Sequence, residues 1–179
     1  GRSFLILDER NLMKGKWLWR YFIIIFWVFF AISFCKGAEL TQREVVAMTI
    51  LGEARGEGKA GMYAVATVIN TRAVNRNKTS RQVCLQYKQF SCWNDNDVNK
   101  AKLGKLYLTH PMRGYAIALA RSITKLDRSY TKHADHYCHV NEKPYWSYRK
   151  VKLSNGKTVK VIIKPVAIIG NHKFYKLRK

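Results

Sequence analysis

At 179 residues the chain has room for one domain with a hydrophobic core and a small appendage, which excludes a large multidomain assembly within this sequence. Its 33 Lys and Arg outnumber its 11 Asp and Glu, so the formal net charge is +22. A surface this basic attracts a polyanion, and nucleic acid, anionic lipid headgroups and an anionic cell-wall polymer all meet that requirement.

The amino-terminal region predicts export. Residues 14–20 are basic and aromatic, and residues 21–34 then form an uncharged run of 14 residues. A membrane span needs about 20 residues, so this run suits a secretory signal better, although an anchor formed by residues 17–35 stays open. The preceding Lys and Arg would keep that end in the cytoplasm. We therefore expect residues 1–38 to direct residues 39–179 to the periplasm, the cell envelope or the medium, which disfavours nucleic acid as a partner.

The cysteines leave the disulfide state open. Cys84, Cys92 and Cys138 follow the export segment, and three thiols cannot all pair with one another. One disulfide, such as Cys84–Cys92, and no disulfide at all are both compatible with this number. The absence of a Cys-x-x-Cys pair disfavours a structural zinc site.

Helical patterns come first along the chain and strand patterns follow. Thr41 and Glu44 have the spacing of a capping box at a helix start. Helices are expected from there to about residue 54, then over 62–72, 80–86, 97–108 and 113–126. Strands are expected over 134–140, 148–153, 158–163 and 166–169, with an Asn155-Gly156 hairpin turn between the middle two. This order indicates one compact α+β domain with a small antiparallel sheet near the carboxyl terminus.

Two carboxylates in a glycine-rich segment are the strongest candidates for chemistry. Glu53 and Glu57 flank Arg55, in a chain with few other acids. Glu53 falls near the end of a predicted helix, where the macrodipole disfavours negative charge and so favours the protonated form that a general acid needs. Glu57 falls near the start of the next helix, where the ionised form is favoured. We predict Glu53 as the catalytic acid, with Glu57 and Arg55 as supporting charges; a solvated helix end is the plain alternative.

Aromatic and polar side chains farther along are candidates for a sugar-binding groove, because sugar rings stack on flat aromatic faces. His136 is a polar candidate, and core packing is the competing interpretation for each of the aromatic candidates, which are Phe90, Trp93, Tyr137, Tyr145 and Trp146. The histidines do not predict a metal centre. On a strand, His136 would face away from His133 and His139, which would lie about 20 Å apart. No metal and no cofactor are expected.

From about Leu40 to Tyr175 the chain resembles the SleB-like cell wall hydrolases, the catalytic domain of spore-cortex-lytic enzymes that also occurs in phage lysis proteins. Blocks that match in order carry the resemblance: Leu51-Gly52-Glu53-Ala54-Arg55-Gly56-Glu57, residues 61–72, Gln89-Phe90-Ser91-Cys92-Trp93, His136-Tyr137 with Pro144 and Trp146, and residues 169–175. The resemblance implies peptidoglycan cleavage on a lysozyme-like domain. It places the catalytic acid at Glu53.

The resemblance also implies the reaction. The later blocks place substrate-binding side chains at Gln89, Ser91, Asn171 and His172, in addition to the groove candidates above. Better-studied members resemble lytic transglycosylases, which cut between N-acetylmuramic acid and N-acetylglucosamine and leave a 1,6-anhydro end. That reaction needs one positioned acid, whereas ordinary glycoside hydrolysis needs two carboxylates. The scattered acids of this chain favour the single-acid scheme.

Two other functions remain open at this stage. One is an N-acetylmuramoyl-L-alanine amidase, which would normally use zinc; the other is a basic wall-binding or membrane-binding module without catalysis. The expected partners are peptidoglycan glycan strands and an anionic wall or membrane surface, with the protein as a monomer. Residues 148–165 form a longer basic segment than the family pattern leads us to expect, and we interpret it as an insertion that faces the wall.

Overall fold

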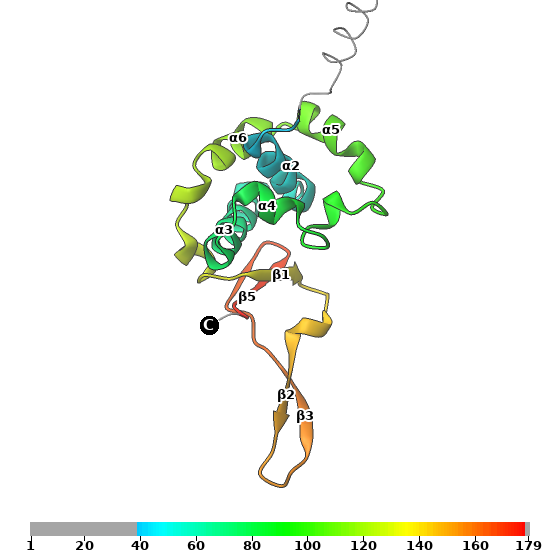
Figure 1. The fold of residues 1–179 in the computed structure, drawn as a ribbon, viewed down its shortest axis with the longest axis vertical. Coiled ribbons are helices and arrows are strands. Elements are labelled where there is room, and N and C mark those ends of the chain that lie inside the picture. Colours follow the sequence, from blue (N-terminus) through cyan, green and yellow to red (C-terminus); the bar gives the residue numbers. More distant parts are fainter. Residues whose placement is uncertain (1–38, 178–179) are drawn as a thin grey trace, which may run out of the picture. The chain divides into compact units, whose positions relative to one another are not determined.

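The computed structural model describes residues 39–177, and residues from Leu40 onward form one compact unit. The export segment lies outside the described residues, so the signal or anchor stays a prediction. Within residues 39–177, no helix is long and apolar enough to cross a membrane. The α-helices of this part are α2 (Gln42–Ala54), α3 (Gly58–Arg76), α4 (Ser80–Leu85), α5 (Lys100–Thr109) and α6 (Arg113–Arg121) (Figure 1).

Helix α2 lies at the centre of the helical part. The predicted capping box forms at its start: Thr41 Oγ1 accepts from the Glu44 amide at 3.3 Å, and Glu44 Oε2 accepts from the Thr41 amide at 2.8 Å. The helix packs against α3, α4, α5 and α6, and Ile50 and Leu51 are fully buried. Because neighbours enclose α2 on several sides, its last turn, which carries Glu53, is held firmly.

Helix α3 joins the helices to the sheet. Met62, Val65 and Ile69 belong to the main core with α2, whereas Ala64 and Val68 pack on the sheet side with Ala134 and Phe174. The predicted stripe of apolar residues is thus core, and the helix is longer at both ends than the expected 62–72. Helix α6 ends at Arg121, whereas the sequence pattern predicted a helix over 113–126. The 3₁₀ turns of the described part are η1 (Ser91–Trp93), η2 (Ile123–Lys125), η3 (Arg128–Thr131) and η4 (Tyr145–Ser147).

The three-stranded sheet contains a strand that the sequence pattern did not predict. Its antiparallel order is β1 (His136–His139), β5 (His172–Tyr175) and β4 (Ala167–Ile169), with β5 in the middle. Ile169 pairs with His172, so Gly170 and Asn171 form the turn, and Gly170 has a φ of 57°. The segment His172–Tyr175 is short and does not alternate, so only its pairing with β1 and β4 identifies it as a strand. Strand β1 also begins two residues later than expected.

The predicted hairpin is confirmed. Strands β2 (Tyr148–Lys152) and β3 (Thr158–Ile162) pair antiparallel with each other and form a sheet of their own. The loop between them contains Asn155, whose Oδ1 accepts from the Lys157 amide at 3.1 Å, and Gly156, whose φ is 79°. In Figure 1 the hairpin projects from the three-stranded sheet, away from the helices.

The thiols of the described part are free. Cys84, Cys92 and Cys138 are buried and unpaired, which agrees with the disulfide-free alternative. Burial raises the pKa of Cys84 to about 12 and also raises the pKa of Cys92 and of Cys138. These thiols therefore stay protonated at neutral pH.

Candidate active site

Three donors from two distant segments converge on Glu53. Its Oε1 accepts from Ser91 Oγ at 3.2 Å and from the Cys92 amide at 3.2 Å. Its Oε2 accepts from the Tyr137 hydroxyl at 2.9 Å. A carboxylate has about four lone-pair sites, so three donors fix its orientation and leave one site, on Oε2, for another proton or ligand. Glu53 itself is half-buried.

The segment that carries Ser91 and Cys92 packs directly against the end of α2. A Cβ built on Gly52 would lie 2.8 Å from Cys92 Cβ, so only glycine allows this approach. One turn earlier, Thr49 Oγ1 accepts from Trp93 Nε1 at 2.8 Å. These contacts place η1 beside Glu53. The indole nitrogen of Trp93 is occupied by its hydrogen bond to Thr49, while Trp93 as a whole stays half-exposed.

Tyr137 comes from β1 and lies 84 positions after Glu53 in the chain. Its ring lies 5.8 Å from the Phe174 ring and 5.2 Å from the His172 ring, centroid to centroid. Burial, followed by the negative charge of Glu53, raises the pKa of Tyr137 well above its usual value. The hydroxyl therefore keeps its proton and acts as a donor to Glu53.

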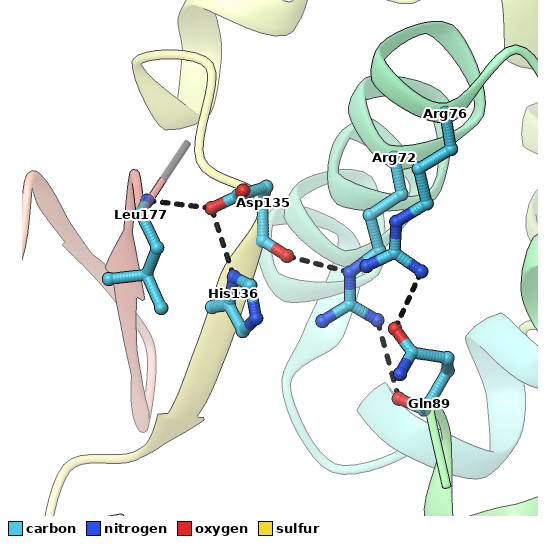
Figure 2. A network of polar contacts seen from close by, with 6 residues as sticks. All are labelled: Arg72, Arg76, Gln89, Asp135, His136 and Leu177. Atoms are coloured by element: carbon cyan, nitrogen blue, oxygen red, sulfur yellow. Dashed lines mark hydrogen bonds and ion pairs between the residues drawn. The ribbon is translucent and has the colours of Figure 1, made fainter. Parts of the chain in front are cut away.

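A buried arginine connects the two segments that supply these donors (Figure 2). Arg72 of α3 is 5% exposed; its Nε donates to the Asp135 carbonyl at 2.6 Å and its Nη1 to the Gln89 carbonyl at 3.3 Å. Asp135 precedes β1, and Gln89 precedes η1. The guanidinium also lies 5.0 Å from the centre of the Phe90 ring. Arg72 thus fixes the distance between the segment of Tyr137 and that of Ser91.

His136 is held by its neighbour in the chain. Its Nδ1 lies 3.0 Å from Asp135 Oδ1, and the same oxygen accepts from the Leu177 amide at 2.8 Å (Figure 2). The imidazole is tilted against the Trp146 ring at 5.1 Å between centroids, and Trp146 in turn meets Tyr175 at 5.3 Å. Asp135 is therefore an orienting residue for a half-buried histidine next to an aromatic ring.

Glu57 binds the turn between β4 and β5. Its Oε2 accepts from the Asn171 amide at 2.7 Å and its Oε1 from Asn171 Nδ2 at 3.2 Å. A Cβ on Gly170 would lie 2.3 Å from Glu57 Oε2, and the φ of 57° at this position favours glycine. Burial alone would raise the pKa of Glu57, but the Asn171 hydrogen bonds outweigh it and the pKa lies below its usual value. Glu57 is therefore ionised at neutral pH, and Asn171 is its hydrogen-bond partner.

His172 lies next to both the Tyr137 ring, which binds Glu53, and the carboxylate of Glu57. Its Nδ1 is buried, lies 3.9 Å from Glu57 Oε2 and has no hydrogen-bond partner among the described residues. Burial lowers the pKa of His172, so the imidazole is favoured in its neutral form. Its ring also lies 6.4 Å from the His139 ring. Within residues 39–177 no set of three or more His, Cys, Asp or Glu is arranged as a metal-binding cluster.

The predicted site residues divide into two sets. Glu53, Ser91, Tyr137, His172, Glu57 and Asn171 lie in one connected group. Trp93 lies beside this group on η1, bonded to Thr49 of α2, and His136 is the first residue of β1, next to Tyr137. The other three predictions are placed elsewhere. Phe90 is 2% exposed in the core, the Gln89 side chain accepts from Arg76 at 2.8 Å, and Arg55 is exposed and donates to Asn99 at 3.4 Å. Phe90 therefore has no free face for a sugar ring, and Arg55 has Asn99 as its hydrogen-bond partner, while Glu57 is held by Asn171.

Sequence reasoning missed three groups that organise this site. The Cys92 amide donates from the backbone, which no residue type encodes. Arg72 falls within residues 61–72, one of the blocks that carry the resemblance. A charged residue on the apolar face of a predicted helix is a sequence signal for a buried polar contact. Asp135 is 2% exposed, and its acidic side chain within a predicted strand was a similar signal.

The fold and the site together define a small α+β domain built around one oriented carboxylate. Residues 56–175, which are more than half of the chain, match the family described as Cell Wall Hydrolase. The chain therefore belongs to the cell wall hydrolase family and is a peptidoglycan-degrading hydrolase in the general sense. The matched range includes Glu57 and the later blocks, and it begins three residues after Glu53. Searches of curated proteins and of solved structures gave no significant match.

Proposed function

We propose that this protein cleaves the glycosidic bond between N-acetylmuramic acid and N-acetylglucosamine as a lytic transglycosylase, with Glu53 as its acid and base. One observation supports this proposal above the others. Glu53 is oriented by donors from η1 and β1 and keeps one lone-pair site on Oε2, the oxygen that Tyr137 binds. A single carboxyl with a fixed orientation and one open position is what proton transfer to a leaving oxygen requires.

The reaction then takes two proton transfers through the same carboxyl. Glu53, in its protonated form, donates its proton to the glycosidic oxygen, and the bond between that oxygen and the muramic anomeric carbon breaks. The carboxylate that results accepts the proton of the muramic 6-hydroxyl, whose oxygen attacks the anomeric carbon. The products are a free 4-hydroxyl on N-acetylglucosamine and a 1,6-anhydro-muramic end, and Glu53 regains its proton. No water is consumed.

The position of Glu57 favours one acid over two. A hydrolase of the usual kind needs a second carboxylate that faces the bond or a water molecule. Both oxygens of Glu57 are bound by Asn171, and Gly170 lies against Oε2. Glu57 thus fixes the β4–β5 turn and, through it, the strand that carries His172. This makes Glu57 a supporting charge.

The half-exposed rim of the site supplies candidates for substrate contact. Ser91 is exposed, and the rings of Trp93 and His136 are half-exposed. Asn171 is exposed at the turn beside Glu57. Ser91 contacts Glu53 directly and Trp93 lies on the same turn, whereas Asn171 binds Glu57 and His136 packs on Trp146. We assign these side chains to binding of the glycan strand. The chain acts as a monomer outside the cytoplasm, where this substrate is found.

Analysis of the product ends tests the proposal. Purified peptidoglycan is digested with the full chain and the fragments are identified by mass spectrometry. We expect 1,6-anhydro-muramic ends; reducing ends would show hydrolysis, and free stem peptides would show an amidase. Glu53→Gln should abolish release of fragments, whereas Glu57→Gln should only reduce it. If no preparation of the protein releases any fragment from peptidoglycan, the protein is the non-catalytic binding module.

A further inference from the structure

The β2–β3 hairpin is a concentrated source of positive charge that the catalytic site does not use. We define the basic hairpin as residues 148–164. Its cations are Arg149, Lys150, Lys152, Lys157, Lys160 and Lys164, and no Asp or Glu follows Glu142 in the chain. Because the two strands pair only with each other, the hairpin presents these side chains without a covering layer.

The register places like charges face to face. Lys150 is directly opposite Lys160, and Lys152 is opposite Thr158. Alternate residues of a strand share a face, so Lys150, Lys152 and Lys160 lie on the same side. Like charges directly opposite each other destabilise an antiparallel pair. Among the residues that the structure describes, the ion pairs do not include a carboxylate on either Lys150 or Lys160. A bound anion would offset this repulsion.

A hollow lies next to the opposed lysines. Its volume is about 410 Å³, and it is lined by Tyr145, Tyr148, Arg149, Lys150 and Lys160. Tyr145, from η4, is 90% exposed. The volume is within the usual range for small-ligand sites. Aromatic rings beside cations suit a ligand that has both a negative charge and an apolar or sugar face.

The shape of the hairpin selects among polyanions. Lys150 and Lys152 follow the strand at a spacing of roughly 7 Å, so the cations form a row that fits a polymer with repeated charges better than a single ion. The turn residues Ser154, Asn155, Gly156 and Lys157 are small or polar, although Leu153 beside them is 42% exposed and Ile162 on β3 is 58% exposed. The turn itself therefore offers little apolar surface to a bilayer. The row of cations therefore favours an extended polymer along the hairpin over a lipid surface at its tip.

We propose that the basic hairpin binds a phosphate-bearing anionic polymer of the cell wall and holds the enzyme on its substrate. The choice of a wall polymer over nucleic acid rests on the proposed function. The binding surface is separate from Glu53: the polymer contacts β2, β3 and η4, while the glycan strand contacts η1, β1 and the β4–β5 turn. Binding should therefore weaken with salt and should not need a functional Glu53.

The experiment measures sedimentation of the protein with purified cell walls. The full chain with Glu53→Gln is the reference, so that cleavage does not release it. The test variant adds Lys150→Gln and Lys160→Gln. The matched control adds Lys78→Gln and Lys125→Gln, two exposed lysines of the helical part, so both variants lose the same charge. Binding of the reference, the test variant and the control variant is measured to four materials. These are intact walls, walls stripped of phosphodiester-linked polymers, vesicles with anionic lipid and a DNA oligonucleotide.

We expect the hairpin variant to bind intact walls roughly tenfold more weakly, as loss of two cation–phosphate contacts implies. The control should bind like the reference, and stripping should reduce binding of the reference to the level of the hairpin variant. Equal binding of the two variants, or no effect of stripping, would overturn the proposal. If the hairpin variant loses binding only to the vesicles or only to the DNA, the proposal is overturned, and lipid or nucleic acid respectively is the partner of the hairpin. Thermal unfolding should show the hairpin variant to be no less stable, because the opposed charges are gone.

Digestion of stripped peptidoglycan separates this inference from the proposed function. With Glu53 intact, the hairpin variant should cleave stripped material at the rate of the unmodified chain and intact walls more slowly. If the unmodified chain cleaves neither material while wall binding still depends on Lys150 and Lys160, the proposed function fails and the polymer-binding hairpin stands. If the hairpin variant loses activity on stripped material as well, the hairpin belongs to the glycan site and the polymer proposal is overturned.

Discussion

The Tyr137 hydroxyl lies 2.9 Å from Glu53 Oε2, although the two residues are 84 positions apart in the chain. This contact joins the end of the central helix to the first strand of the sheet. Its donor stays protonated because burial and the charge of Glu53 raise the pKa of Tyr137 well above its usual value. The orientation of the proposed acid thus depends on how the helical part and the sheet are packed together.

Removal of that hydroxyl should affect catalysis more than folding. In Tyr137→Phe the ring can keep its contacts with Phe174 and His172, while Glu53 loses one of three donors. We expect kcat to fall about 10- to 100-fold, as for a hydrogen bond to a charged group, with little change in KM. Tyr63→Phe is the matched control, since that hydroxyl accepts from the Asp127 amide at 3.1 Å, outside the site. Equal losses of kcat in both variants would contradict a specific role for Tyr137.

The close approach of η1 to α2 should make Gly52 intolerant of a side chain. Gly52→Ala places a Cβ 2.8 Å from Cys92 Cβ, which should push Ser91 and the Cys92 amide away from Glu53. We expect the free energy of unfolding to fall by about 1–3 kcal/mol, together with a fall in kcat in the folded fraction. Gly104→Ala in α5 is the control, because nothing lies within 4 Å of its added Cβ. Chemical denaturation and initial rates measure the two effects; a fully active Gly52→Ala enzyme would show that η1 adjusts without cost.

Arg72 should act as a positioning residue. Arg72→Lys keeps the charge but cannot hold both the Asp135 and the Gln89 carbonyls in the same geometry. At a temperature where the variant is folded, we expect kcat to fall about tenfold while KM changes less, because the donors to Glu53 shift. Arg76→Lys, which alters contacts with the Gln86 and Gln89 side chains, should retain most activity. A fall in stability without any change in kcat would reduce Arg72 to a purely structural role.

Glu57 should link stability to acid pH. Its pKa is lowered from the ordinary 4.5 in the folded protein, so its contribution is fully present above about pH 4.5 and is lost as the pH falls through the lower folded pKa. Glu57→Gln should therefore destabilise the protein by roughly 1–3 kcal/mol at neutral pH and by progressively less below pH 4.5. Thermal melts of both proteins from pH 7 to pH 3 measure this difference. A difference that does not vary with pH would mean that the charge of Glu57 is not what binds Asn171.

The thiols of the described part should be inert in the native state. Burial raises the pKa of Cys84 to about 12 and raises that of Cys92 and Cys138, so little thiolate exists at pH 8. The chain has a fourth cysteine, Cys35, in the amino-terminal segment, which Cys35→Ser removes from the measurement. In that variant, a thiol reagent should label the other three cysteines slowly before unfolding and completely after it. Mass spectrometry without reductant should find no internal disulfide. A Cys84–Cys92 bond in the isolated protein would restore the alternative that the sequence left open.

Much of the architecture followed from local patterns. The capping box at Thr41, the apolar stripe of α3 and the Asn155-Gly156 hairpin are encoded by residues within a few positions of one another. Such signals are local, so the sequence alone determined the helices, the β2–β3 pair and the α+β class. It also brought Glu53 forward as a carboxylate near the end of a helix, and its blocks pointed to the cell wall hydrolase family.

Tertiary structure decided what those residues contact. Strand β5 exists because β1 and β4 pair with it, and no alternation marks it in advance. The donors to Glu53 include a backbone amide, Phe90 is core where a groove was expected, and Glu57 binds Asn171, 114 positions away. Hydrogen bonds between distant segments depend on chain topology and packing, which a local pattern does not encode. The sequence therefore brought forward the acid at the end of the first predicted helix, and only the packed domain decided which groups orient it.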